Sequence, residues 1–234
     1  MKVTIIDDDK AILDSLKMTF NLCWQETSVF TTRLGEEGIQ IVERKLPDIV
    51  ILDLGLPDIS GFSVLKQVRQ FPSVPVIILT VRGDEADIVK GLGLGADDYI
   101  IKPFRQMEFI ARVKANARRQ NIPTESTNIK TDIFSLNVYQ HELVFRGKRI
   151  ILTRSECIIF SELVKNPNGV RTYFNLAQAL WHKEYPGYDQ AIRVYIKRLR
   201  EKIESSPSEP EYIRIKVGEG YFLNLPVKER ARQP

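Results

Sequence analysis

The sequence predicts two linked domains: a doubly wound α/β domain built on a five-stranded parallel sheet, and a smaller α+β domain after it. The chain has 234 residues, more than one domain usually contains. In its first half, five short runs rich in β-branched residues alternate with helical segments. The second half opens with apolar/polar alternation and closes with a hairpin pattern. We therefore expect domains over 1–120 and 129–225, a linker over 121–128 and a disordered tail over 226–234.

Strands and helices alternate along the first half. The predicted strands are 3–6, 28–30, 48–52, 74–79 and 99–101. The predicted helices are 11–22, 35–45, a helix that ends at Gln70 after the turn Pro57–Gly61, 84–93 and 104–120. The strand runs are apolar throughout, as expected of strands that helices cover on both faces.

The second half begins after a polar, proline-containing stretch that has no periodicity and is typical of a linker. Alternation indicates antiparallel strands near 133–138, 143–145 and 150–152. Thr153 and Glu156 form a capping-box pattern, which predicts a helix to about Lys165. Two more helices follow over 174–181 and 189–204, and a hairpin over 212–223.

Composition argues against several classes of protein. No run approaches the roughly 18 apolar residues of a membrane span, and the first residues do not resemble a signal peptide. Cys23 and Cys157 lack the spacing of a metal or redox motif and fit a reducing cytoplasm. With His141 and His182 as its histidines, the chain offers little for a zinc site or a Ser-His-Asp triad. We expect a cytoplasmic protein without membrane contact.

The charge differs between the two halves. Residues 1–121 carry 16 Lys and Arg against 17 Asp and Glu, whereas residues 122–234 carry 18 against 13. A near-neutral first half joined to a second half of net charge +5 indicates that the second half meets a polyanion such as nucleic acid. The alternative is chance, because many folds carry such an excess.

Polar side chains follow the predicted parallel strands. They are Asp7, Asp8, Asp53, Thr80 and Lys102. Each alone could be a loop residue or a helix cap, but parallel strands bring their carboxyl ends to one edge, where doubly wound folds bind ligands. Carboxylates gathered there repel one another unless a cation such as Mg²⁺ is bound. With a lysine and a hydroxyl added, the set suits a transferred phosphoryl group.

This pattern resembles the receiver domain of two-component response regulators, which has a flavodoxin-like fold. The matching residues are Asp7-Asp8, Asp53-Leu-Gly-Leu-Pro57, Gly61, Thr80 and Lys102-Pro103, in this order within about 1–120. The resemblance implies a sensor histidine kinase as partner and Mg²⁺ as cofactor. It implies that Asp53 is the phosphoacceptor and that Asp8, Asp53 and the backbone carbonyl of Gly55 ligate the metal, with Asp7 acting through water.

The resemblance also assigns the residues that respond to the phosphoryl group. Thr80 and Lys102 would contact its oxygens, and Tyr99 would be an aromatic switch that turns inward when Thr80 moves. Tyr99 could instead be a buried aromatic residue at the sheet edge. Asp9 is expected to be a helix N-cap rather than a further ligand. Val81 departs from the family, which usually has a small residue after the threonine.

The segment from Gly95 onward resembles the dimer face of the OmpR/PhoB subfamily. The residues implied in pairs between subunits are Asp97, Asp98, Glu108, Arg112, Lys114 and Arg119. The alternative is a solvated helix with pairs inside the chain, since Glu108 and Arg112 are four residues apart. Ile88 departs from the family by standing where a basic partner of Glu108 is expected.

The helix expected over 189–204 is rich in cations. Its predicted buried side consists of Ile192, Ile196, Leu199 and Ile203. Its other faces carry Arg193, Lys197, Arg198, Arg200 and Lys202, with only Asp189 and Glu201 against them. Such a helix fits the major groove of double-stranded DNA, whereas an ordinary solvated helix usually balances its cations with acids.

The second half as a whole resembles the winged-helix DNA-binding domain of OmpR/PhoB regulators. The matching segments are Leu152-Thr-Arg-Ser-Glu156, Asn166-Pro-Asn-Gly-Val170, Leu180-Trp181, Val194-Tyr-Ile-Lys-Arg-Leu-Arg200 and Gly218-Glu-Gly-Tyr221. The resemblance implies base contacts by Val194 and Arg198 and phosphate contacts by Gln190, Lys197 and Arg200.

Two positions of this domain depart from the family. Arg193 replaces an acid and adds a cation to the DNA-contacting set, and Val217 stands where a wing arginine often enters the minor groove. Arg214 and Lys216, which alternate on one strand, are expected to compensate for Val217.

Together these features predict a transcription factor that phosphorylation activates. Phosphorylation of Asp53 would favour a homodimer through the face made by the fourth helix, fifth strand and fifth helix, and the dimer would bind repeated promoter sites and RNA polymerase. One alternative is an aspartate-using phosphohydrolase, although Gly55 stands where such an enzyme needs a second acid. Another is a constitutive DNA-binding protein with a vestigial receiver.

Overall fold

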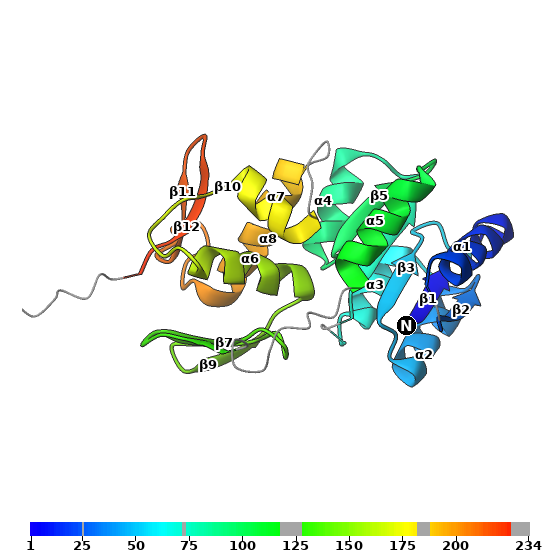
Figure 1. Cartoon of the computed structure of the whole chain (residues 1–234), viewed down its shortest axis with the longest axis horizontal. Coiled ribbons are helices and arrows are strands. Elements are labelled where there is room, and N and C mark those ends of the chain that lie inside the picture. The colour runs from blue at the N-terminus through cyan, green and yellow to red at the C-terminus, as the bar shows by residue number, and fades with distance from the viewer. Residues whose placement is uncertain (25, 72–73, 118–127, 182–187, 226–234) are drawn as a thin grey trace, which may run out of the picture. The chain divides into compact units, whose positions relative to one another are not determined.

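The structure is a computed structural model that describes residues 1–24, 26–71, 74–117, 128–181 and 188–225 (Figure 1). The chain divides into two compact units, Met1–Cys157 and Ile158–Pro234. Of the linker predicted over 121–128 only Asn128 is described, and the tail predicted over 226–234 lies outside the described residues.

A five-stranded parallel sheet forms the centre of the first 117 residues. Its strands are β1 (Lys2–Ile6), β2 (Ser28–Thr32), β3 (Ile49–Leu52), β4 (Val76–Thr80) and β5 (Asp98–Ile101). They lie in the order β2-β1-β3-β4-β5, and every neighbouring pair is parallel. The chain moves outward from β1 to β2 and then returns past β1 to β3, so the strand order reverses there. This topology confirms the doubly wound fold.

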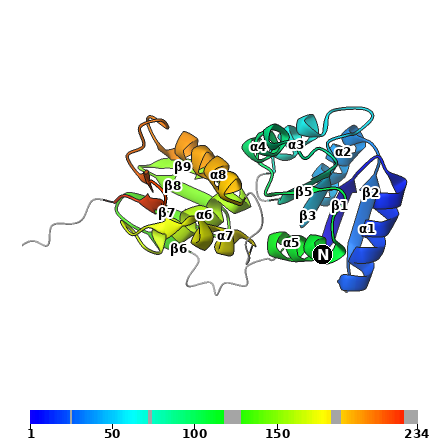
Figure 2. The ribbon, with the colours of Figure 1, turned by 90° about the horizontal axis from the view of Figure 1, so that it is seen from above.

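Helices cover both faces of this sheet, as Figure 2 shows. Helices α1 (Lys10–Cys23) and α5 (Gln106–Ala117) lie on one face, and α2 (Gly35–Lys45), α3 (Gly61–Val68) and α4 (Glu85–Gly93) lie on the other. Leu13, Leu16 and Phe20 of α1 pack into one buried cluster with Phe109 of α5 and with the strands. Because both faces are covered, β3 is buried at all four positions, which explains its unbroken apolar sequence.

Strand register brings the polar ends of the strands together. Ile6 of β1 pairs with Leu52 of β3, so the residues that follow them, Asp7 and Asp53, leave the sheet side by side. The Asp53 N–H continues the ladder by donating to the Ile6 carbonyl (2.8 Å). On the other side of β3, Thr80 is the last residue of β4, and the N–H of Lys102 donates to its carbonyl (2.8 Å).

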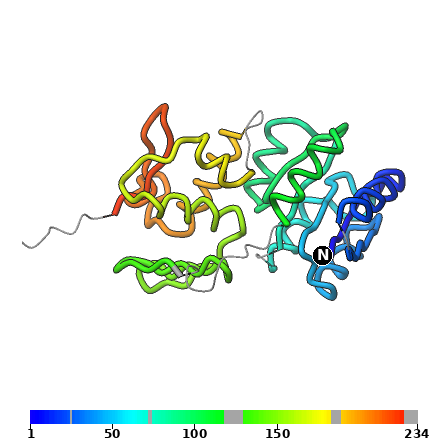
Figure 3. The backbone as a smooth tube through the Cα atoms, in the orientation of Figure 1, coloured from blue at the N-terminus to red at the C-terminus, as the bar shows by residue number. Residues whose placement is uncertain are grey.

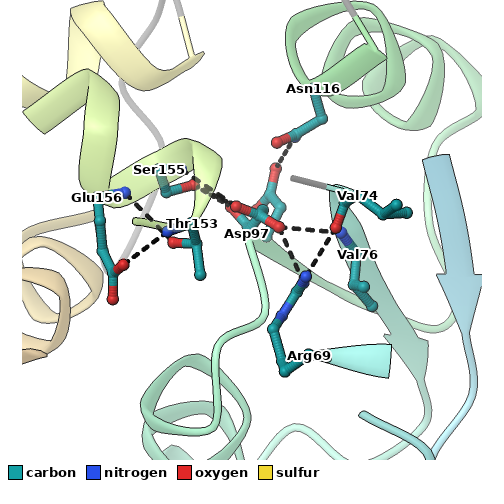
Figure 4. A network of polar contacts seen from close by, with 9 residues as sticks. Arg69, Val74, Val76, Asp97, Asn116, Thr153, Ser155 and Glu156 are labelled. Atoms are coloured by element: carbon teal, nitrogen blue, oxygen red, sulfur yellow. Dashed lines mark hydrogen bonds and ion pairs between the residues drawn. The ribbon is translucent and has the colours of Figure 1, made fainter. Parts of the chain in front are cut away.

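Four short strands and a helix follow from Asn128 onward. The strands β6 (Asn128–Lys130), β7 (Phe134–Asn137), β8 (Glu142–Phe145) and β9 (Lys148–Ile151) form an antiparallel sheet in sequence order. Helix α6 (Arg154–Val164) begins with the predicted capping box. The Thr153 N–H donates to the Glu156 carboxylate (2.7 Å), and the Glu156 N–H donates to the Thr153 hydroxyl (3.4 Å) (Figure 4). Two backbone N–H groups at the start of the helix are thereby satisfied.

The C-terminal unit contains two more helices and a wing hairpin. Helices α7 (Tyr173–Trp181) and α8 (Tyr188–Ile203) precede the hairpin of β11 (Ile213–Lys216) and β12 (Gly220–Leu223), which is the red loop of the tube in Figure 3. The sequence did not predict β10 (Arg171–Thr172), which pairs with β12 and makes a three-stranded sheet. A Cβ at Gly220 (φ +158°) would lie 2.1 Å from the Arg171 carbonyl oxygen, so this pairing requires glycine.

Within the residues that the structure describes, no helix is long and apolar enough to cross a membrane.

Candidate functional site

Three carboxylates meet at the carboxyl edge of the parallel sheet, and we call this group the acidic notch. Its members are Asp7 and Asp8 after β1 and Asp53 after β3, and each offers an oxygen within 4.8 Å of the others. Asp7 and Asp53 are buried, whereas Asp8 is half-buried. The structure thus brings these three residues together at one edge of the sheet, as the sequence predicted.

Lys102 neutralises part of this charge. Its Nζ lies 2.6 Å from an Asp7 oxygen and 2.9 Å from an Asp53 oxygen. Burial alone would lower the pKa of Lys102, but these two carboxylates outweigh burial and raise it. Lys102 follows β5 directly and is joined to Pro103 by a cis peptide bond. One ammonium thus bridges two strand ends.

Asp53 is held in its ionised form. Burial would raise its pKa, but the hydrogen bond from Lys102, the Thr80 hydroxyl and the Gly55 N–H together hold the pKa of Asp53 below its usual value. The Leu54 and Gly55 N–H groups both donate to Oδ1, at 2.6 and 3.2 Å. The Lys102 ammonium is on Oδ2. Asp53 therefore presents a carboxylate, the form that acts as a nucleophile.

The backbone next to Asp53 leaves no room for a side chain at Gly61. A Cβ there would lie 2.3 Å from the Asp53 carbonyl oxygen and 2.6 Å from Leu54 Cα. Helix α3 begins at Gly61 and so packs its first turn directly on the strand end that carries Asp53. This close approach gives a physical reason for the glycine in the predicted motif.

The two neighbours of Asp8 have different environments. Burial raises the pKa of Asp7, and the Lys102 hydrogen bond only partly offsets this effect. Asp9 instead caps α1, because its side chain accepts from the Ala11 N–H at 2.8 Å. Asp9 is thus an N-cap, as predicted, and Asp7 is the acid that most needs a cation nearby.

The donor set of the acidic notch fits Mg²⁺, a hard cation that prefers carboxylate oxygens and keeps several waters. Three carboxylates with one ammonium leave the notch with excess negative charge, which a divalent ion can balance. The notch opens into a cavity of about 820 Å³ lined also by Gly55, Thr80 and Val81. Val81, the branched residue that departs from the family, is 73% exposed and stands at this cavity.

Tyr99 lies inward and is connected to the residue that follows Val81. Its ring is 8% exposed, and its hydroxyl donates to the Arg82 carbonyl at 2.6 Å. Burial, together with the nearby Asp87 charge, raises the pKa of the Tyr99 phenol. The Arg82 N–H donates to the Thr80 hydroxyl at 3.4 Å. Thr80 and Tyr99 thus share Arg82 as a hydrogen-bonding neighbour.

The residues implied in a dimer face make pairs inside the chain. Arg112 binds Asp98 at 2.7 Å and Glu108 at 2.9 Å. Asp97 accepts from Arg69 and from the Val76 N–H, each at 3.0 Å (Figure 4). Among the other predicted members, Lys114 lies over the Trp24 ring at 5.8 Å and Arg119 lies outside the described residues. These contacts match the alternative of intrachain pairing and leave a dimer face a prediction.

Helix α8 divides into a buried and a charged side, as predicted. Its apolar stripe of Ile192, Ile196, Leu199 and Ile203 is buried. Arg193 and Lys197 are exposed, and Gln190 and Arg198 are half-buried. We call Arg193, Lys197 and Arg198 the recognition face. Such a row of cations can contact DNA phosphates and bases.

Two predicted DNA contacts on α8 have other surroundings. Val194 is 8% exposed, so most of its side chain is buried. Arg200 donates from Nε to the Ile213 carbonyl at 2.9 Å and lies over the Tyr221 ring at 5.7 Å. The sequence pattern did not reveal the surroundings of Arg200, because the wing strands that supply them are distant along the chain.

The wing hairpin presents an exposed valine at its turn. Arg214 and Lys216 are exposed, but Lys216 pairs with Glu219 at 2.9 Å. Val217 is 86% exposed at the turn between β11 and β12. Arg214 and Lys216 were predicted to compensate for Val217, but one of these two cations, Lys216, has an acid beside it.

A ladder of two arginines and two tyrosines, which sequence analysis missed, joins α8 to α7 and the wing. Arg193 lies over the Tyr173 ring at 5.2 Å, and Tyr173 meets Tyr221 edge to face at 5.5 Å. Arg200 lies over the Tyr221 ring at 5.7 Å. Burial and the hydrogen bond with Tyr173 raise the pKa of Tyr221 to about 12. We call these four residues the Arg-Tyr ladder.

Comparison with known proteins gives two family matches. The family described as response regulator receiver domain matches residues 3–114, and the family described as transcriptional regulatory protein, C terminal, matches residues 147–223. The two matches cover the parallel-sheet domain with its acidic notch and the domain that carries α8 and the wing.

Several solved structures are similar to this chain. The response regulator DrrB from Thermotoga maritima, an OmpR/PhoB homologue, is 29% identical over 95% of this chain and 98% of its own, with a TM-score of 0.49. The BeF3-activated DrrB receiver domain is 34% identical over 48% of this chain and 93% of its own, with a TM-score of 0.44. A RitR mutant has the same fold, at 20% identity over 95% of this chain and 98% of its own, with a TM-score of 0.75.

The acidic notch thus lies in the segment that the receiver family matches. The cationic helix α8 lies in the later segment that the transcriptional regulatory family matches. The chain belongs to the two-component response regulators of the OmpR/PhoB subfamily, DNA-binding transcriptional regulators that respond to phosphorylation.

Proposed function

We propose that this regulator accepts a phosphoryl group from a histidine kinase on Asp53 and then dimerises on repeated promoter sites. The observation that carries the proposal is the acidic notch, in which Asp7, Asp8 and Asp53 offer oxygens within 4.8 Å of one another beside the Lys102 ammonium. A phosphoacceptor needs an ionised carboxylate with cations close to the incoming oxygens. This notch combines both.

Mg²⁺ would be held by Asp8, Asp53 and the Gly55 carbonyl, with Asp7 acting through water. The bound ion would supply positive charge against the phosphoryl oxygens. The remaining chemistry belongs to the chain. An Asp53 oxygen forms the new P–O bond while the P–N bond to the donor histidine breaks, and the imidazole keeps the electron pair and takes up a proton. Lys102 and the Thr80 hydroxyl bind the transferred oxygens.

The response is proposed to pass through Thr80, Arg82 and Tyr99. Movement of Thr80 toward the phosphoryl group displaces the loop after β4, whose Arg82 carbonyl already accepts the Tyr99 hydroxyl. The charge added at Asp53 then biases a two-state face made of α4, β5 and α5. Dimerisation through this face would place two DNA-binding domains on neighbouring sites, where tethering raises the effective concentration of the second. RNA polymerase would be the further partner at the promoter.

Acetyl phosphate with Mg²⁺ tests the phosphoacceptor. We expect the intact mass to rise by one phosphoryl group in the wild type and in Asp9→Asn, whose asparagine still caps α1. Asp53→Asn should gain nothing, and a chelator should prevent the gain in every variant. Phosphorylation of Asp53→Asn to the wild-type level would contradict the assignment. Sustained release of phosphate over many turnovers would favour a phosphohydrolase instead.

Footprinting of genomic DNA fragments tests the output. We expect protection of paired sites to need less protein when the phosphodonor is present, and this gain should vanish in Asp53→Asn. Equal protection by both proteins, with and without phosphodonor, would indicate a constitutive DNA-binding protein with a vestigial receiver.

A further inference from the structure

Gly91 lies on the side of α4 that faces the sheet. Helix α4 spans Glu85–Gly93, and its buried residues are Gly91 and Leu92. A Cβ built at Gly91 would lie 2.6 Å from Ile78 Cδ1 and 3.3 and 3.4 Å from two carbons of the Tyr99 ring. The first distance is shorter than real Cβ contacts, and the other two are tighter than most. Glycine therefore permits the present approach of α4 to these two side chains.

Ile78 and Tyr99 together form the floor beneath Gly91. They are directly paired residues of the neighbouring strands β4 and β5, so their side chains lie on the same face of the sheet. Ile78 is fully buried, and Tyr99 is 8% exposed. A methyl group at position 91 must therefore displace Ile78 Cδ1 within a closed core, the Tyr99 ring, or α4 itself.

A hydrogen bond fixes the inward position of the Tyr99 ring. Its hydroxyl donates to the Arg82 carbonyl at 2.6 Å, which ties the inward ring to the loop after β4. A shift of the ring away from α4 would break this bond and expose apolar ring surface. The space beneath Gly91 and beside Ile78 is thus a slot that the inward ring occupies.

We propose that Gly91 is a positioning residue for the switch: by carrying no side chain, it keeps open the slot in which Tyr99 lies inward. The proposal rests on the proposed function in one respect, namely that the inward ring favours the dimer. It adds a residue that contacts neither the acidic notch nor the phosphoryl group. The free energy that separates the two ring positions is set in part by the packing of α4 on β4 and β5.

The test compares alanine at two glycines of the same helix. Gly91→Ala introduces the methyl into the slot, whereas a Cβ at Gly93 would meet no atom within 4 Å. Both changes replace glycine by alanine in the last turn of α4, so the large part of any difference between them comes from the slot. Ile78→Val/Gly91→Ala removes the Cδ1 that the new methyl overlaps and should restore the slot, with Ile78→Val as its reference.

The position of the ring is read directly by fluorine NMR of the full chain labelled with 3-fluorotyrosine. The resonance of Tyr99 among the 8 tyrosines is assigned by its loss in Tyr99→Phe. We expect this resonance to move toward its solvent-exposed position in Gly91→Ala. It should stay in place in Gly93→Ala, and the double variant should match Ile78→Val.

The effect on the switch is read by sedimentation with acetyl phosphate and Mg²⁺. We expect Gly91→Ala to be phosphorylated but to need about tenfold more protein than Gly93→Ala to dimerise, because a ring less often inward reduces the competent fraction. An unchanged resonance in Gly91→Ala, or a double variant that fails to return to the Ile78→Val position, would overturn the proposal. If Gly91→Ala does not fold, the double variant still decides it. If the wild type takes up no phosphoryl group, the proposed function fails, and the resonance alone decides the role of Gly91.

Discussion

The acidic notch and the recognition face hold their charges in opposite ways. The notch is assembled from two separate segments of the chain, and its buried members Asp7 and Asp53 share the ammonium of Lys102, which comes from a third segment. The recognition face belongs to a single helix, where Arg193 and Lys197 are exposed. Coupled, buried charges act as a unit, whereas separated, solvated charges contribute nearly independently. We therefore expect a single substitution in the notch to remove most of the phosphorylation rate, whereas each substitution on the recognition face should remove a separate part of the DNA affinity.

Loss of the shared ammonium should give the largest effect. Lys102→Met removes the partner of both Asp7 and Asp53, so the phosphoryl oxygens lose a fixed positive charge and the carboxylates repel each other. We expect phosphorylation by acetyl phosphate to slow by about 100-fold, the usual cost of removing one preorganised donor. Lys17→Met, on the exposed side of α1, is the control and should react as the wild type does. A change below threefold in Lys102→Met would mean that the notch does not act as a unit.

Substitutions on the recognition face should add up. We expect Arg193→Ala and Lys197→Ala each to reduce by about one the slope of log affinity against log salt for a mixed-sequence DNA duplex, and the double variant to reduce it by about two. Lys165→Ala on α6, which pairs with Glu162, should leave the slope unchanged. A double variant no weaker than either single one would show that these cations are coupled, contrary to the comparison.

We expect the Arg-Tyr ladder to make a small contribution to DNA affinity, because it supports Arg193 of the recognition face. Tyr173→Leu removes the ring beneath Arg193, and an exposed cation–π contact contributes about 0.5–1 kcal/mol. We therefore expect an approximately threefold loss of affinity for the same duplex by fluorescence anisotropy. Tyr173→Phe keeps the ring and loses only the 3.5 Å hydroxyl contact with Tyr221, so its affinity should stay within about twofold of the wild type. Equal losses in the two variants would assign the effect to the hydroxyl.

Asp58, five residues after Asp53 in the sequence, is an acid outside the notch, and its substitution has the smallest expected effect. Desolvation would raise its pKa, but the backbone N–H groups of Glu36 and Gly35 hold the pKa of Asp58 below its usual value. A lowered pKa stabilises the fold above pH about 3.8, and this contribution disappears as the pH falls through the lowered value. Asp58→Asn should thus lower the urea midpoint slightly near neutral pH, with a difference that shrinks in acid. A difference that grows in acid would contradict the sign.

Features that depend on local pattern could be predicted from the sequence. The apolar strands, the capping box at Thr153 and the buried stripe of α8 each follow from a short stretch of residues. The convergence of Asp7, Asp53 and Lys102 was also predictable, because parallel topology alone brings strand ends to one edge.

Features that depend on distant partners could not be predicted. The two-residue strand β10 exists only because β12 is available to pair with it. Arg200 and Val194 have suitable residue types for a DNA-facing helix, but their surroundings depend on how the domain packs around α8. The sequence likewise did not show that Lys102 bridges two carboxylates, since its ammonium could have paired with Asp7 alone or with Asp53 alone.

The bridge made by Lys102 has a consequence for the life of the protein in the cell. Because its own ammonium already offsets the repulsion between Asp7 and Asp53, we expect the receiver to fold without waiting for a metal ion. Under the proposed function, magnesium supply would then govern how fast the regulator is switched, while the amount of folded regulator stays the same.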